Sequence, residues 1–101
     1  MKLLIHFLLP FILVFNLCGQ ELITQKNANK TDLKLFQKGV LLYQSNQFEK
    51  AKSLFEKLVI QNPKFIDAHL QLASVCYDLQ NFACAQLHFK QVLDLDSMFN
   101  P

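Results

Sequence analysis

The sequence predicts an all-α fold in which two helix-turn-helix pairs stack as a short right-handed solenoid. The first observation is internal repetition: residues 32–65 and 66–99 place the same kinds of residue at the same positions, 34 residues apart. A fixed period of this length is typical of stacked supersecondary units. The second observation is that apolar residues inside each unit recur at steps of three and four, the spacing that gives a helix one apolar face.

The two units match at small and aromatic positions. The matched pairs, one residue from each unit, are Gly39 and Ala73, Phe48 and Phe82, Ala51 and Ala85, and Phe55 and Phe89. Small side chains let two antiparallel helices approach to about 8–10 Å, and we expect the four phenylalanines to fill the space between and behind each pair. A glycine inside a helix costs about 1 kcal/mol relative to alanine, so Gly39 indicates a packing requirement.

The first unit divides into two helices. A helical stripe begins at Asp32 and is interrupted at residues 45–47. Asn46, followed three residues later by Glu49, is predicted to form a capping pair that opens the second helix. That helix is expected to end at Asn62, because the proline that follows disfavours helical backbone in the residue before it.

The second unit repeats this plan. Its helices are expected over about residues 66–79 and 82–95, with a break at Gln80 and Asn81. Residues 100–101 are the candidate start of a further helix, since proline is favoured in the first turn of a helix.

Two segments resemble tetratricopeptide (TPR) repeats. They are Gly39…Phe48-Glu-Lys-Ala51-Lys-Ser-Leu-Phe55…Pro63 and Ala73…Phe82-Ala-Cys-Ala85-Gln-Leu-His-Phe89. The resemblance covers residues 32–99 in register. It departs from the family where Leu35 and His69 replace a frequent tryptophan, and where Ser97 takes the place that Pro63 has in the first unit. The resemblance implies a stacked-pair fold and a function in binding proteins.

The resemblance also implies where a partner would bind, because the first helix of each TPR pair lines a concave surface. Carried onto this chain, the lining residues are Leu33, Phe36, Val40, Tyr43 and Gln44 from the first unit, and Asp67, Leu70, Ser74, Tyr77 and Asp78 from the second. The lysines and asparagines with which some TPR domains hold a carboxylate are replaced here by Phe36, Val40, Leu70 and Ser74, so that binding mode is not supported.

Two interpretations of this lining remain open. Tyr43 and Tyr77 recur one repeat apart and are expected to form a neighbouring aromatic pair that, with Phe36, holds an apolar partner segment. Alternatively, the same side chains pack on the N-terminal leader or on further repeats. The sequence alone does not separate these two interpretations.

The N-terminus has the pattern of a secretory signal peptide over residues 1–19. A basic start is followed by an apolar run and then by a small, uncharged stretch that ends at Gly19. The run is shorter than the about 20 apolar residues that a membrane-spanning helix needs. Lipidation at Cys18 is disfavoured because Leu17, not a small residue, precedes it. Residues 20–31 are polar and are expected to form a flexible leader.

Nothing in the sequence indicates an enzyme, a cofactor, a metal ion or a nucleic-acid partner. With two glycines in all, the glycine-rich phosphate loops and nucleophile elbows are excluded. The chain has no arginine, the residue best suited to phosphate recognition. Cys84 and His88 have metal-ligand spacing on one helix, but a zinc site requires three or four protein ligands and no other cluster lies near this pair.

The cysteines and the charge distribution leave further alternatives. Cys76 and Cys84 either form a disulfide, which export would permit, or remain thiols, with Cys76 buried where Leu42 packs in the first unit. Residues 20–65 carry eight lysines and four acidic residues, whereas residues 66–101 carry one lysine and four aspartates. This polarity is compatible with head-to-tail contact between like modules, although two solvated faces explain it as well.

The function expected from these features is protein–protein interaction outside the cytoplasm. We expect an exported, periplasmic or secreted scaffold module with a protein or peptide partner, and contact with the membrane only through the signal peptide. Because solenoids usually need about three repeats, we expect the N-terminal part of a larger envelope protein. The alternatives are a complete small secreted adaptor that self-associates, and a recruiting arm joined to a downstream enzymatic domain.

Overall fold

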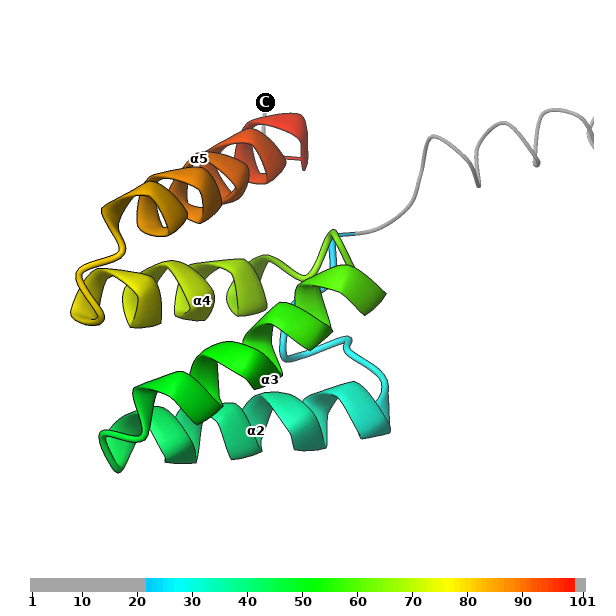
Figure 1. Cartoon of the computed structure of the whole chain (residues 1–101). Coiled ribbons are helices and arrows are strands. Elements are labelled where there is room, and N and C mark those ends of the chain that lie inside the picture. Colours follow the sequence, from blue (N-terminus) through cyan, green and yellow to red (C-terminus); the bar gives the residue numbers. More distant parts are fainter. Residues whose placement is uncertain (1–21, 100–101) are drawn as a thin grey trace, which may run out of the picture.

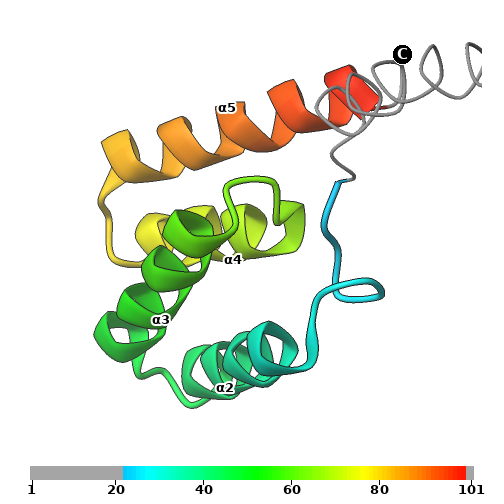
Figure 2. The ribbon, with the colours of Figure 1, turned by 90° about the vertical axis from the view of Figure 1, so that its right-hand side faces the viewer.

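The computed structural model describes residues 22–99, which form four helices in two antiparallel pairs (Figure 1). In chain order the helices are α2 (Lys30–Gln44), α3 (Phe48–Gln61), α4 (Ile66–Asp78) and α5 (Phe82–Phe99). α4 packs between α3 and α5, and among the described helices α5 contacts α4 alone. α2 and α5 therefore lie at opposite ends of the stack (Figure 2). The predicted all-α fold of two stacked helix pairs is confirmed.

Some expectations concern residues outside the described range. These are the signal peptide over residues 1–19, lipidation at Cys18 and a further helix from residues 100–101. Within residues 22–99, no helix is both long and apolar enough to cross a membrane.

α2 begins two residues before the expected start because Asn29 caps it. The backbone of Asn29 is extended, and its side-chain Oδ1 accepts a hydrogen bond from the Asp32 backbone N–H at 2.8 Å. The buried carboxylate of Asp32 in turn accepts hydrogen bonds from the side-chain amides of Asn29 and Asn62. Since Asn62 is the C-cap of α3, this cluster ties the start of α2 to the end of its partner helix.

The predicted capping pair of Asn46 and Glu49 is wrong. Asn46 lies in the left-handed backbone region with φ 62°, as does its counterpart Gln80 with φ 63°, so both residues turn the chain out of the preceding helix. The N-cap of α3 is Gln47, whose side chain makes no capping hydrogen bond. In the second unit the residue at that position, Asn81, accepts a hydrogen bond from Cys84 N through Oδ1 at 3.2 Å.

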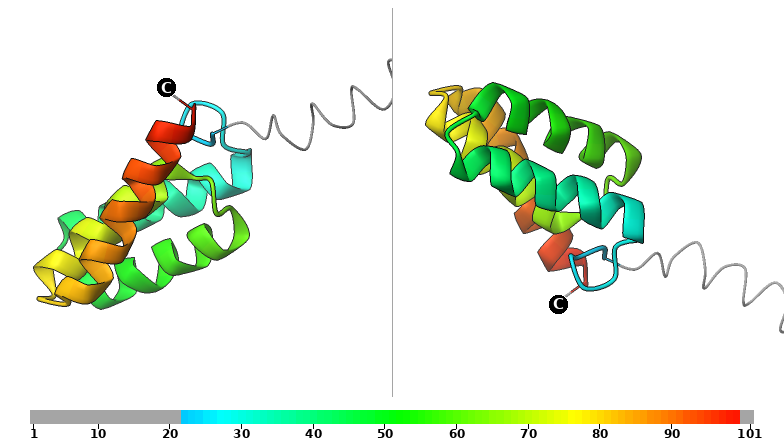
Figure 3. Two further views of the ribbon diagram at one scale, coloured as in Figure 1. Left: turned by 90° about the horizontal axis from the view of Figure 1, so that it is seen from above. Right: turned by 90° about the horizontal axis from the view of Figure 1, so that it is seen from below.

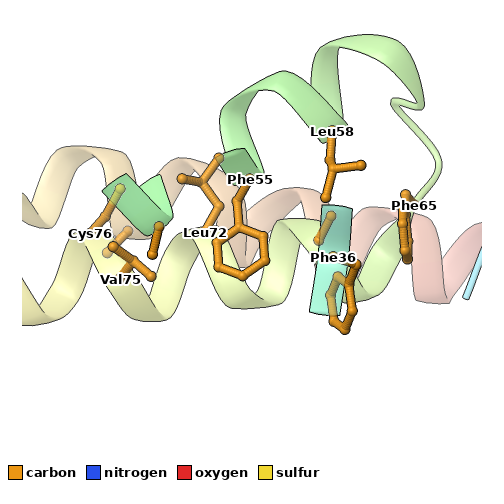
Figure 4. Packing of buried hydrophobic residues seen from close by; sticks show 10 residues of the cluster. Phe36, Phe55, Leu58, Phe65, Leu72, Val75 and Cys76 are labelled. Carbon is orange, nitrogen blue, oxygen red and sulfur yellow. The ribbon is translucent and has the colours of Figure 1, made fainter. Parts of the chain in front are cut away.

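The core lies between α2, α3 and α4 (Figure 4). Phe36 stacks on Phe65 with ring centroids 5.3 Å apart and meets Phe55 edge-on at 5.8 Å. Gly39 packs directly against the Phe55 ring, so the small residue serves close packing between α2 and α3. Viewed along the stack, α5 crosses the direction of α3, so successive pairs are rotated relative to each other (Figure 3). The buried core residues are Phe36, Ala51, Phe55, Leu58, Phe65, Ala68, Leu72, Val75, Cys76 and Ala85.

The expectation that all four matched phenylalanines fill the core is wrong for α5. Phe55 is fully buried, but its counterpart Phe89 is 38 % exposed and Phe82 is 53 % exposed. The difference arises because α4 covers the outer side of α3, whereas no described helix covers the outer side of α5.

The segment expected to be a flexible leader folds back onto the helices over residues 22–29. Ile23 N donates to Lys64 O and Ile66 N donates to Ile23 O, both at 2.9 Å, which forms a single parallel bridge beside Phe65. The side chains of Ile23 and Ala28 pack against the core. These contacts hold the start of the described chain against the loop between α3 and α4.

Candidate partner-binding surface

The ten predicted lining residues lie on α2 and α4, the first helices of the two pairs. Their accessibility differs widely. Phe36 is buried; Leu33, Val40, Tyr43, Asp67 and Ser74 are half-buried; Gln44, Leu70, Tyr77 and Asp78 are exposed. Three of the four exposed residues lie on α4, so the accessible part of the lining is concentrated on that helix.

Phe36 is not available to a partner. Its side chain is only 3 % exposed because the rings of Phe55 and Phe65 enclose it. The sequence placed Phe36 correctly on the first helix but could not show that Phe65, from the loop that leads into α4, stacks on it. Phe36 is thus a core residue, and its prediction as a contact residue is corrected.

Asp67 lies under the N-terminal segment. Its carboxylate Oδ2 accepts a hydrogen bond from Gln25 N at 2.7 Å. Together with the bridge at Ile23, this contact covers the N-terminal end of α4 with the chain's own backbone. Of the two interpretations left open by the sequence, packing on the leader therefore holds for this end of the lining.

Tyr43 and Asp78 join the two units at the other end of the lining. The Tyr43 hydroxyl donates a hydrogen bond to Oδ2 of Asp78, which links the C-terminal ends of α2 and α4. This hydrogen bond, with smaller contributions from burial and from the negative charge of Asp78, raises the pKa of Tyr43 to about 12. Tyr43 therefore remains a neutral donor at physiological pH, and its hydroxyl hydrogen is already engaged by Asp78 within the chain.

The expected pairing of Tyr43 with Tyr77 is replaced by pairing within each unit. The Tyr43 ring meets Phe48 edge-on, and the Tyr77 ring meets Phe82 in the same way, each with centroids 5.5 Å apart. The described aromatic contacts include no contact between the two tyrosine rings. A tyrosine followed five residues later by phenylalanine, repeated at 34 residues, was the sequence signal for these pairs.

The Tyr77–Phe82 pair is the most accessible aromatic feature near the lining. Tyr77 is 59 % exposed and Phe82 53 % exposed, whereas in the first unit Tyr43 and Phe48 are half-buried. Leu70 is 42 % exposed on the same helix as Tyr77, and Asp78 adds an exposed carboxylate next to it. We call Leu70, Tyr77, Asp78 and Phe82 the aromatic–acidic surface. Phe82 is a residue that the sequence-based lining omitted.

Cys76 and Cys84 form a disulfide between α4 and α5, with their Cα atoms 5.8 Å apart. The sulfur of Cys84 is therefore not free to join His88 as a metal ligand. Within residues 22–99, no group of three or more histidine, cysteine, aspartate or glutamate side chains is placed to hold a metal ion. The two cysteines serve the packing of the second pair.

A histidine pair also joins α4 to α5. His69 Nε2 donates to Pro63 O at 2.7 Å, which leaves Nδ1 of the neutral ring as an acceptor for the N–H of His88 Nδ1 at 3.1 Å. The rings stack with centroids 5.3 Å apart. Burial lowers the pKa of His69, although the bond to Pro63 opposes this. Burial, and next the charge of His69, lowers the pKa of His88, against opposing effects of Gln91 and Glu56.

Comparison with protein families identifies this architecture. The family model described as tetratricopeptide repeat matches residues 42–97, more than half of the chain. The chain belongs to the tetratricopeptide-repeat family. Comparison with curated proteins and with solved structures finds no match.

The matched range runs from the C-terminal end of α2 to the last turns of α5 and so contains three of the four helices almost completely. TPR units are non-catalytic modules that generally bind other proteins, and the match identifies no enzymatic domain within its range. In a TPR fold, exposed side chains on the stack are candidates for partner binding, and the aromatic–acidic surface, on α4 and the start of α5, is the best candidate near the predicted lining.

Proposed function

We propose that this protein is an exported TPR module that binds an apolar, positively charged segment of a partner protein, and so acts as a scaffold in the cell envelope or outside the cell. The observation that supports this proposal most is the pair of exposed rings, Tyr77 and Phe82, beside the exposed carboxylate of Asp78. Aromatic side chains on a rigid element are the usual centre of binding energy in protein interfaces.

The chemistry of the surface specifies the partner segment. Leu70, Tyr77 and Phe82 offer apolar area, which favours leucine, methionine or aromatic side chains in the partner. Asp78 favours a lysine or arginine next to them, since a charged hydrogen bond at the rim of an apolar contact fixes register and selects against acidic segments. The disulfide and the histidine pair hold α4 and α5 together and keep Tyr77 and Phe82 in place.

Selection from a random peptide library on the immobilised protein tests the binding proposal. Selected peptides are expected to combine apolar residues with at least one basic residue, and Tyr77→Ala is expected to weaken their binding about tenfold or more. Leu87→Ala is the matched control, because Leu87 is 53 % exposed, close to the 59 % of Tyr77, but lies outside the aromatic–acidic surface. Selected peptides that bind wild-type protein and Tyr77→Ala equally would contradict the proposed surface.

Export is supported by the basic, apolar and then small-residue pattern of residues 1–19, and it agrees with a disulfide in the mature part. A reporter enzyme that is active only outside the cytoplasm, fused after residue 21, is expected to become active. Sequencing the N-terminus of the purified protein is expected to show cleavage near Gly19. An inactive reporter together with an intact Met1 would contradict export.

A further inference from the structure

The outer side of α5 carries exposed apolar side chains whose counterparts in α3 are buried or half-buried. Phe89 is 38 % exposed whereas its counterpart Phe55 is fully buried, and Leu93 is 66 % exposed whereas its counterpart Val59 is half-buried. We call Phe89 and Leu93 the α5 end face. Because α4 covers α3, the packing of α4 on α3 shows what kind of surface fits the α5 end face.

α4 meets its two neighbouring helices with two different stripes of residues. His69 and Cys76 face α5, because they contact His88 and bond to Cys84. The adjacent stripe of Ala68, Leu72 and Val75 is also fully buried, and α3 is the helix that packs on the other side of α4. This second stripe is therefore the one that covers α3.

The residues of α2 that correspond to this second stripe are exposed. Lys34, Lys38 and Leu41 take the places of Ala68, Leu72 and Val75, and Leu41 is 63 % exposed. We call Lys34, Lys38 and Leu41 the α2 end face. The two ends of the stack thus present the two halves of a contact that α3 and α4 already make within the chain (Figures 1 and 2).

We propose that the α5 end face of one molecule binds the α2 end face of a second copy, head to tail, in the manner in which α3 packs on α4. Leu41 and the aliphatic stems of the two lysines would cover Phe89 and Leu93, while the ammonium groups stay in water. This proposal uses helix sides distinct from the aromatic–acidic surface, so a partner peptide and a second copy do not compete for the same residues.

Charge complementarity favours a second copy in this orientation. The short connection between α3 and α4 places the C-terminal end of α3 beside the N-terminal end of α4. The same arrangement between copies brings the last turns of α5, with Asp94 and Asp96, beside the first turns of α2, with Lys30 and Lys34. If two copies instead paired through their α5 helices in parallel, the acidic last turns of the two helices would lie near each other and repel.

The existing surface ion pair does not prevent this contact. Lys90 Nζ lies 3.2 Å from Asp94 Oδ2, but the two side chains are 75 % and 62 % exposed. Exposed pairs of this kind contribute little to stability, so Asp94 can exchange Lys90 for a lysine of another copy at small cost. The electrostatic part of the contact also makes it sensitive to salt.

The symmetry of the contact gives a distinctive result in solution. A head-to-tail contact joins two different surfaces, so it leaves one free end of each kind and extends into open chains instead of stopping at a dimer. Sedimentation equilibrium of the protein, expressed from its full coding sequence and purified as its host processes it, is expected to show a mass that rises with concentration beyond that of a dimer.

Two variants block one end each without disturbing a buried residue. Leu93→Glu blocks the α5 end face, and Lys34→Glu with Lys38→Glu blocks the α2 end face. Each is expected to weaken association about tenfold or more, as is an increase from low to high salt. Leu87→Glu is the matched control, since Leu87 corresponds to the exposed Ser53 of α3 and lies off the end face. Circular dichroism checks that all variants keep their helices.

Mixing the two blocked variants decides the orientation. Each has one intact end of the opposite kind, so the mixture is expected to form a one-to-one complex that grows no further. A variant with Asp94→Lys and Asp96→Lys is expected to recover binding to the lysine-to-glutamate variant. A wild-type protein that stays monomeric at all concentrations would overturn the proposal. Association that Leu93→Glu abolishes and the α2 substitutions leave unchanged would also overturn it, because it would show pairing of α5 with α5.

Discussion

Gly39 of α2 lies in direct contact with the ring of Phe55 in α3. A Cβ atom at position 39 would lie 2.7 Å from both Cε1 and Cζ of that ring, closer than real Cβ atoms approach other atoms. Phe55 is fully buried and is enclosed further by Phe36, so its ring has little room to move away. The glycine is therefore required by packing and not by backbone conformation, because its φ is not positive.

Gly39→Ala is expected to destabilise the protein despite the better helix propensity of alanine. Alanine gains about 1 kcal/mol inside a helix, whereas forcing an extra methyl group into a filled core costs about 1–3 kcal/mol. Urea unfolding followed by circular dichroism measures the difference. Gly39→Ala combined with Phe55→Leu serves as the control, since the smaller side chain leaves space for the methyl group. A stabilised single variant would show that Phe55 moves freely.

The internal repeat made most of the fold predictable from the sequence. Small and aromatic residues such as Gly39 and Phe55 recur in both units. They determine the distance between two packed helices wherever both helices belong to the repeat. The burial of Phe89 was mispredicted because it depends on a neighbour beyond α5, and the repeat pattern contains no information about that neighbour. The burial of Phe36 was missed for another reason, since it depends on Phe65, which lies in the loop before α4 and outside the helical stripes.

The contacts of the N-terminal segment were not predictable for a different reason. Ile23 is held to Lys64 and Ile66 by backbone hydrogen bonds, which any residue can make and which leave little trace in composition. The contact between His69 and His88 was also not predictable from the sequence, because the two residues lie 19 positions apart on different helices and belong to no common motif. The Tyr77–Phe82 pair, by contrast, has a signal in the repeated tyrosine–phenylalanine spacing, although we expected Tyr77 to pair with Tyr43 instead.

Gln80→Gly is expected to stabilise the protein. Gln80 has φ 63°, a left-handed conformation that costs a side chain with a Cβ roughly 1 kcal/mol and costs glycine almost nothing. Its N–H donates to Tyr77 O at 2.9 Å, and this turn is retained by glycine. Thermal unfolding compares Gln80→Gly with Asn46→Gly at the matching position. The second change should gain less, because asparagine tolerates this conformation better.

Removal of the Cys76–Cys84 disulfide is expected to lower stability moderately. The bond closes a loop with a sequence separation of 8 residues, for which the loss of chain entropy in the unfolded state corresponds to about 2.5 kcal/mol. Unfolding in denaturant with and without a reductant measures the difference, and alkylation before reduction shows whether either thiol is free. The double variant Cys76→Ala and Cys84→Ala is the control, since a reductant should leave it unchanged. A wild-type free energy of unfolding that is the same with and without the reductant would contradict this prediction.

The His69–His88 contact is expected to make the protein less stable in mild acid. Both histidine pKa values are lowered in the folded chain, so between those values and about 6.5 the unfolded chain binds more protons than the folded one. The stability associated with the neutral pair is therefore complete above about pH 6.5 and is lost as the pH falls below that value. Glu56 on α3 and Gln91 on α5 favour the protonated form of His88 and oppose the loss without reversing it.

The free energy of unfolding, measured between pH 7.5 and 5.5, is expected to fall toward pH 5.5 in the wild-type protein. In His88→Gln the slope is expected to be smaller, because only His69 then titrates with a lowered pKa and no second imidazole accepts a proton beside it. Measurements above pH 5 exclude most of the titration of ordinary carboxylates, whose pKa values lie near 4. A wild-type stability that rises on acidification would show that protonated rings are accommodated between α4 and α5.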